Sequence, residues 1–92
     1  MILHISSIIV QVNSLAWSSV YDSIEKQEHA SISASDEGQG KMIVVLEAPS
    51  LHDTQNMIDA LKAIKGVVSA TMVYHHSEPA SELNQPLYEH AS

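Results

Sequence analysis

The sequence predicts one α+β domain with four strands and two helices in the order β-α-β-β-α-β. Three observations support this prediction. Four segments alternate apolar and other residues with a period of two, which is typical of half-buried strands. Two segments between them repeat apolar residues at the spacing of an amphipathic helix, and a glycine-containing turn joins the second strand to the third. The 92 residues suffice for one core and leave little room for a second.

The first predicted strand spans residues 3–12, "LHISSIIVQV". Its alternation places three residues on one face: Ile8, Val10 and Val12. A helix follows, because Asn13 or Ser14 can cap a first turn, and it runs to about Gln27. Its apolar stripe has the spacing i, i+3, i+4, i+7 and consists of Trp17, Val20, Tyr21 and Ile24.

The second predicted strand, "ASISAS" at residues 30–35, is short and polar enough to lie at an edge of the sheet. Its core face consists of Ala30, Ile32 and Ala34. The turn "DEGQG", residues 36–40, has two glycines that can supply positive φ angles. The third strand, "GKMIVVLEA" at residues 40–48, is apolar on both faces, and its second face ends in Glu47. Its core face consists of Met42, Val44 and Leu46.

The second helix has a start signal and a stop signal. Ser50 and Asp53 form a weak version of a capping box, and Gly66 is well placed just beyond the last turn. The apolar stripe between them consists of Met57, Ile58, Leu61 and Ile64. The last predicted strand spans residues 67–75, and its core face consists of Val68, Ala70, Met72 and Tyr74.

This order of elements is the ferredoxin-like split βαβ fold. Right-handed crossovers place both helices on one face of a four-stranded antiparallel sheet with strand order 4-1-3-2. The first and third strands are the most apolar, as central strands should be. We predict a domain at residues 1–76 and a flexible tail at residues 77–92, because the tail has two prolines and no sustained period.

The face of the sheet that the helices leave uncovered is unusually apolar. Its predicted residues are Ile9, Gln11, Ile43, Val45, Glu47, Ser69, Thr71, Val73 and His75. Four of these are β-branched aliphatic residues on three adjacent strands, and a patch of that kind usually marks a contact surface. Two alternatives remain: a homodimer stacked sheet to sheet, or β-branched residues chosen only for strand propensity.

Charge and composition limit the classes of partner and of site that this chain can have. Four Lys, no Arg and eleven Asp and Glu give a net charge of −7, which disfavours nucleic acid and anionic membranes and favours a cationic partner. The chain has no Cys, so it has no thiolate nucleophile and no cysteine-based zinc site. His75 and His76 point to opposite faces of a strand, so we expect no metal site and no catalytic residues. Neither a secretory signal nor a membrane span is evident, so the expected location is the cytoplasm.

Three segments match one known family. They are "SIIVQV" (7–12), "GKMIVVLEA" (40–48) and "GVVSATMVYHH" (66–76), separated by helices of the right length. Together they resemble the NapD family, small cytoplasmic maturation chaperones of the periplasmic nitrate reductase. Members of that family often have a Pro-Gly turn before the second strand, where this chain has Glu28-His29-Ala30.

The resemblance implies a ferredoxin-like chaperone, with no enzymatic activity and no cofactor of its own. Its partner would be the twin-arginine signal peptide of the nitrate reductase catalytic subunit. Binding, with the peptide helical on the uncovered face, would delay Tat export until the molybdenum cofactor is inserted. The arginines would meet the carboxylate of Glu47, with Glu78 and Glu82 reaching from the tail. The implied binding residues are Ile9, Gln11, Ile43, Val45, Glu47, Thr71, Val73 and His75.

A regulatory domain of the ACT type, which binds small molecules as a dimer, is the main alternative on the same fold. Such domains have a glycine-rich loop after the first strand, and "VQVNSLAW" (10–17) has no glycine. An RNA-recognition module would need exposed aromatic residues on the central strands. Ile9, Ile43 and Val45 occupy those positions here.

Overall fold

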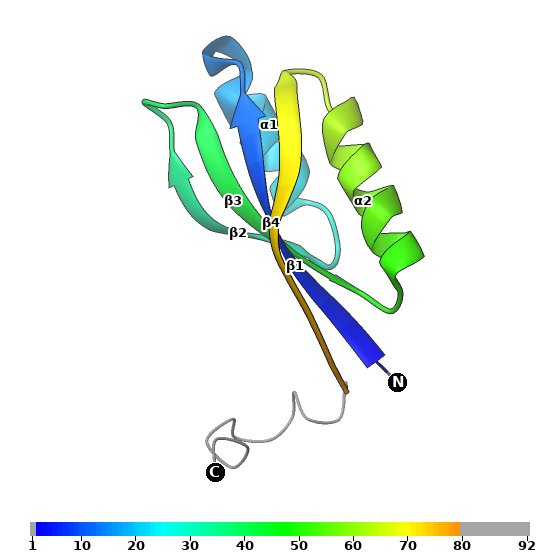
Figure 1. Ribbon diagram of the computed structural model, residues 1–92. Coiled ribbons are helices and arrows are strands. Elements are labelled where there is room, and N and C mark those ends of the chain that lie inside the picture. Colours follow the sequence, from blue (N-terminus) through cyan, green and yellow to red (C-terminus); the bar gives the residue numbers. More distant parts are fainter. Residues whose placement is uncertain (1, 80–92) are drawn as a thin grey trace.

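The computed structural model describes residues 2–79, which form a four-stranded antiparallel sheet with two helices on one side (Figure 1). The elements are β1 (Ile2–Val12), a short 3-10 turn η1 (Ser14–Ala16), α1 (Trp17–Glu25), β2 (Ala30–Asp36), β3 (Lys41–Ala48), α2 (Leu51–Ala63) and β4 (Val67–Pro79). The strand order β2-β3-β1-β4 is the predicted one, which confirms the ferredoxin-like fold. No helix within residues 2–79 is long and apolar enough to cross a membrane.

The core lies between the sheet and the two helices. It consists of Ile8, Val10 and Val12 of β1, Met42, Val44 and Leu46 of β3, Ala70 of β4, Trp17, Val20 and Ile24 of α1, and Ile58 and Leu61 of α2. The predicted inward residues of the two central strands are therefore confirmed. The predicted stripes of both helices also face the core, with Tyr21, Met57 and Ile64 only partly buried.

Capping side chains mark the start of η1 and the start of α2. Asn13 caps η1, its side-chain oxygen accepting a hydrogen bond from the Leu15 backbone N–H at 3.0 Å, and α1 starts only after this turn. Ser50 caps α2 in the same way, since its Oγ accepts from the Asp53 backbone N–H at 3.0 Å and donates to that residue's carboxylate. The capping prediction for α2 is confirmed.

Three loops contain residues with positive φ angles, one of them Gly66 in the loop before β4. In the β2–β3 turn only Gly40 of the two glycines has one, at 67°, and a Cβ there would lie 2.7 Å from the Val12 carbonyl oxygen. In the loop before β2, His29 adopts φ 66°, a left-handed conformation that favours glycine, and its carbonyl accepts from the Glu47 backbone N–H. The bend before β2 thus forms at a non-glycine residue, His29.

The central pair of strands has an unbroken register, whereas β2 departs from it. β1 pairs with β3 without interruption from His4–Ala48 to Gln11–Lys41. β2 shifts by one residue between Ile32 and Ala34, so that Ile32 lies opposite the core residue Val44 but Ala34 lies opposite Ile43. Because opposed residues share a face, the prediction that Ala34 faces the core was wrong.

A bulge in β4 reverses the predicted faces at the end of the sheet. Met72 lies opposite Ile8, but the next pair is Tyr74 with Ser7, so Val73 is an extra residue. Tyr74 therefore faces away from the helices and is 56% exposed, although the sequence predicts it in the core. His75 moves the other way and lies opposite the buried Ser6, on the side of the helices, which corrects its predicted place on the uncovered face.

A second shift lies at the start of β4. Val12 pairs with Val67 rather than Val68, and Val68 is 67% exposed, so its predicted core position was also wrong. At the other end β4 continues to Pro79, three residues past the predicted domain boundary. The remainder of the predicted tail lies outside the described residues.

Candidate functional site

We define the bare face as the side of the sheet opposite the helices. The register assigns to it Leu3, Ile5, Ser7, Ile9 and Gln11 of β1; Ser31, Ala34 and Asp36 of β2; Lys41, Ile43, Val45 and Glu47 of β3; and Ser69, Thr71, Tyr74, His76 and Glu78 of β4. Six of the eight predicted site residues lie on it: Ile9, Gln11, Ile43, Val45, Glu47 and Thr71. Val73 is the bulge residue and is 55% exposed, and only His75 is on the opposite side.

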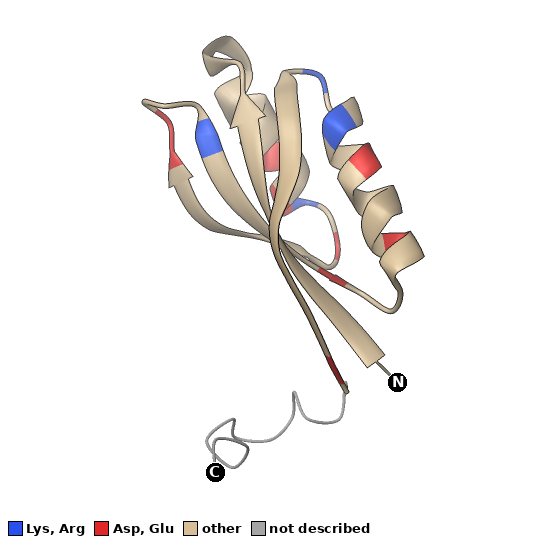
Figure 2. Cartoon of the chain, in the orientation of Figure 1, with Lys and Arg blue, Asp and Glu red and all other residues tan. Residues whose placement is uncertain are grey.

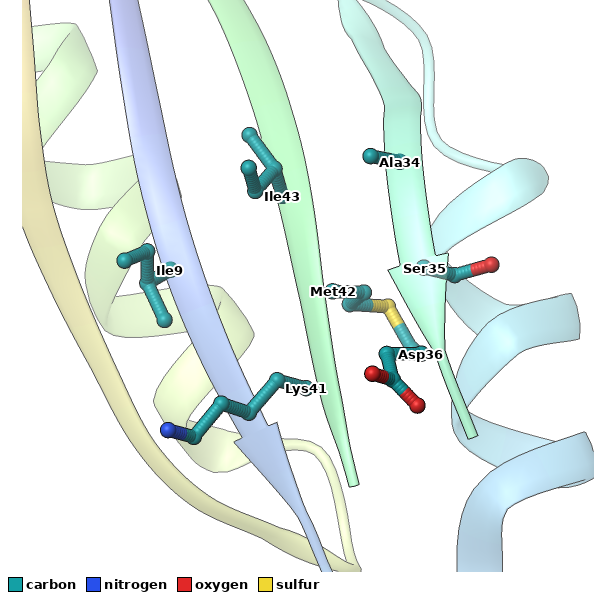
Figure 3. A pocket seen from close by; sticks show the side chains of 7 residues that line it. All are labelled: Ile9, Ala34, Ser35, Asp36, Lys41, Met42 and Ile43. Atoms are coloured by element: carbon teal, nitrogen blue, oxygen red, sulfur yellow. The ribbon is translucent and has the colours of Figure 1, made fainter. Parts of the chain in front are cut away.

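The middle of the bare face is aliphatic. Ile9 and Ile43 lie opposite each other on the two central strands, flanked by Ala34 on β2 and Thr71 on β4. A shallow hollow of about 220 Å³ opens here, toward the β2–β3 turn (Figure 3). Its lining residues are Ile9, Ala34, Ser35, Asp36, Lys41, Met42 and Ile43. The bulge in β2 contributes directly to this hollow, because it turns Ala34 toward Ile43.

Acidic side chains flank β1 at the opposite end of the bare face. Ile5 lies between Glu47 on β3 and His76 on β4, and Leu3 lies opposite Glu78. His76 Nε2 is 3.2 Å from the Glu78 carboxylate, and the tilted rings of Tyr74 and His76 have centroids 5.3 Å apart. Among residues 2–79 no cation lies within 4 Å of the Glu47 carboxylate, which is exposed. This end therefore offers an unpaired acid and a second acid within reach of a guest on β1.

Charged residues avoid the middle of the sheet. Figure 2 shows that the strands are almost free of charge along their centres, while acidic and basic residues gather on the helices, the loops and the ends of the strands. On the bare face itself, charge is confined to the two ends: Asp36 and Lys41 beside the β2–β3 turn, and Glu47 and Glu78 at the other end. The surface is thus an apolar strip between two charged ends.

His75 has a structural partner on the side of the helices. Its Nε2 is 3.1 Å from Nδ1 of His4, and the ring planes differ by only 15°. The ring centroids are 5.3 Å apart, which is 2.2 Å more than the distance between the two nitrogens. This difference is close to twice the distance from an imidazole nitrogen to its ring centre, so both nitrogens lie nearly on the line that joins the two centroids. The rings therefore meet edge to edge in one plane, joined by an N–H···N hydrogen bond between β1 and β4, with no room for a metal ion between the two nitrogens. No group of three metal-binding side chains occurs within the described part of the chain.

Several bare-face residues are absent from the sequence-based prediction, for two different reasons. Tyr74, His76 and Ala34 reach this face only through the bulges, which have no clear signature in the alternation of residues. Ile5 and Leu3 were accessible to sequence reasoning, because the alternation of β1 continues unbroken to its start. Extending that alternation from Ile9 would have found them.

Comparison with known proteins gives a consistent result. The model of the family described as "NapD protein" matches residues 3–79. The chain is 31% identical over 75 residues to a protein of Haemophilus influenzae named "Chaperone NapD", covering 82% of this chain and 81% of the relative. It is 27% identical over 78 residues to the "Chaperone NapD" of Escherichia coli K12, covering 85% and 90%.

A solved structure resembles the fold closely. It is the solution structure of the E. coli Tat proofreading chaperone protein NapD, which superposes with a TM-score of 0.74 at 24% sequence identity. The match covers 91% of this chain and 87% of that protein.

Proposed function

Because this chain belongs to the NapD family, we propose that it is a cytoplasmic maturation chaperone that binds the twin-arginine signal peptide of the periplasmic nitrate reductase catalytic subunit. Binding holds the precursor back from Tat export until its molybdenum cofactor is inserted. The bare face is the binding surface, and the chain acts by binding rather than by catalysis. The observation that supports this most directly is an apolar strip on the open face of the sheet, beside the exposed carboxylate of Glu47, which has no cation within 4 Å among the described residues.

The chemistry of such a peptide fits the two parts of this surface. A twin-arginine signal has two adjacent arginines followed by an apolar segment. One apolar side of a helical segment can lie across Ile9, Ile43 and Val45, as amphipathic helices lie in apolar grooves. The guanidinium groups can make charge-assisted hydrogen bonds with carboxylates, of which Glu47 and Glu78 are the two at the end of β1.

The charge of the whole chain adds to this recognition. The net charge of −7, with no Arg present, attracts a basic peptide and disfavours acidic competitors. The attraction is screened at high salt, so association should slow as ionic strength rises. The apolar contact, in contrast, is insensitive to moderate salt and sets how long the complex lasts.

Replacing both arginines of the signal peptide with lysine should weaken binding by about tenfold or more, because lysine keeps the charge but lacks the two-pronged donor geometry. Alanine at both positions should weaken it further. Isothermal calorimetry with the synthetic peptide measures both effects. Equal affinity for the arginine and alanine peptides would contradict the proposal, and heat from a free amino acid or nucleotide but none from the peptide would favour the ACT-type alternative.

Neighbouring substitutions on β4 test which side chains meet the peptide. Tyr74→Ala should weaken peptide binding by about tenfold, because it removes an exposed aromatic ring from the bare face. His75→Ala should leave the affinity within about twofold, since His75 points to the side of the helices and loses only a contact with His4. Calorimetry of both variants with one peptide gives the comparison. The opposite ranking would mean that β4 has no bulge at Val73.

A further inference from the structure

We infer that the bound peptide has a fixed direction on the bare face and runs parallel to β1. Its arginines lie at the start of β1, between Glu47 and Glu78, and its apolar segment continues toward the hollow beside the β2–β3 turn. This inference rests on the proposed function and adds to it the direction of the guest, which neither the fold nor the family resemblance specifies.

The two charged ends of the bare face differ in net charge. Among residues 2–79, the charged groups at the start of β1 are the carboxylates of Glu47 and Glu78, one on each side of the strand, and the His76 imidazole lies near the second. At the other end the Lys41 ammonium extends toward β1, as Figure 3 shows. A pair of guanidinium groups is therefore attracted at the first end and meets a like charge at the second.

Asp36 does not reverse this difference. It lies on the outer strand β2 directly opposite Lys41, and its carboxylate accepts a hydrogen bond from the Gln39 backbone N–H at 3.2 Å. Glu37, the next acid in the turn, lines a different depression on the helix side together with Trp17 and Tyr21. The turn end of the bare face thus carries one acid and one base, which together have no net charge, whereas the other end carries two acids.

The apolar hollow supplies a second, independent reason for this direction. It lies at the Ile9–Ile43 pair, toward the turn and away from Glu47 and Glu78, and its aliphatic lining favours contact with apolar side chains of the guest. The reverse direction would place the arginines over this hollow beside Lys41. A helical guest in the inferred direction also brings the positive end of its dipole to Glu47 and Glu78.

Strand and helix geometry fix the spacing of the two contacts. Leu3 and Ile5 mark the carboxylate end and Ile9 marks the hollow, a span of about 13–20 Å at about 3.3 Å per strand residue. A helix rises about 1.5 Å per residue, so the guest residues in the hollow should follow the arginines by about 9–13 positions. That places them within the apolar segment of the signal peptide.

The direction can be measured with spin labels, because the chain has no Cys and one can be introduced at a single site. Ile2→Cys and Gln39→Cys place a nitroxide at the two ends of the sheet, outside the proposed contacts. With an isotope-labelled signal peptide bound, the Ile2→Cys label should broaden the amide signals around the arginines. The Gln39→Cys label should broaden those of the apolar segment.

The possible outcomes separate the two proposals. A peptide that binds but shows the reversed pattern, or equal broadening from both labels, overturns the direction while leaving the chaperone function standing. A peptide whose spectrum does not change on addition of the chain overturns the function itself. Only binding together with the expected pattern supports both.

Charge variants give a second readout with a matched control. Glu47→Gln should weaken binding of the native peptide by about tenfold and have little effect on a peptide whose arginines are replaced by glutamine. Glu37→Gln, an acid-to-amide change in the turn but outside the hollow, should leave the affinity within about twofold. Asp36→Asn, at the edge of the hollow, should weaken binding less than Glu47→Gln does, because only apolar guest residues lie there in the inferred direction. A larger loss from Asp36→Asn than from Glu47→Gln overturns the inferred direction.

Discussion

Val45→Glu should lose signal-peptide binding, by at least about 100-fold, while the protein stays folded. Val45 lies on the bare face opposite Ser7 and Ser31, so a carboxylate there remains in water in the free chaperone. Binding would bury that carboxylate against apolar guest residues, which costs several kcal/mol without a partner. Ile43→Glu should act in the same way, since Ile43 is also on this face and 37% exposed.

The adjacent substitution, Val44→Glu, is the matched control and should unfold the protein. Val44 is fully buried, between Ile8 of β1 and Ile32 of β2, so the new carboxylate would enter the core. The expected loss exceeds about 4 kcal/mol, a large part of the stability of a small domain. Circular dichroism and calorimetry on all three variants separate the effects. Normal peptide binding by Val45→Glu would show that the bare face is the wrong site, and a stable Val44→Glu would show that the register of β3 is wrong.

Gly66→Ala should destabilise the domain by about 3 kcal/mol or more. Gly66 has φ 104°, a conformation that side chains rarely adopt, and its carbonyl accepts from the Asn13 backbone N–H at 2.8 Å. A Cβ at this position would lie 2.4 Å from the Ala16 Cβ and 3.0 Å from a Val20 methyl group. Both the backbone at Gly66 and the packing of this loop against η1 and α1 would have to shift.

Gly38→Ala provides the comparison for this effect. The nearest atom to a Cβ there is the Asp36 carboxylate oxygen at 3.4 Å, and Gly38 has no positive φ. Its stability should stay within about 1 kcal/mol of the unmodified protein. Urea unfolding of both variants measures the difference. The double variant Gly66→Ala/Ala16→Gly should recover part of the loss, and equal midpoints for the two single variants would contradict the tight approach of Gly66 to α1.

The sequence predicts the central half of this sheet well, for a physical reason. β1 and β3 pair over their common length without a bulge, so the period of two assigns their faces correctly from His4–Ala48 to Gln11–Lys41. The inner residues of both strands are also buried in the core, which makes the apolar requirement strict. The helix caps were equally predictable, because Asn13 and Ser50 act through contacts with their immediate neighbours.

The outer strands could not be predicted to the same degree. A bulge adds one residue and exchanges the two faces beyond it, yet the residues at the bulges, such as Val73 and Ser33, are ordinary strand residues. The alternation therefore gives the right strand and the wrong side for Tyr74, His75 and Ala34. An outer strand is hydrogen-bonded to a neighbouring strand on one side only, so it tolerates such shifts. A bulge there requires no characteristic local sequence.

The same bulges affect how strongly molecules of this protein associate at high concentration. β2 and β4 are the two outer strands of the sheet, and each carries at least one register shift. An irregular edge strand is a poor template for pairing with a strand of another molecule, whereas a regular edge strand promotes aggregation. The irregular outer strands should therefore limit edge-to-edge association between molecules, even though the bare face exposes apolar side chains.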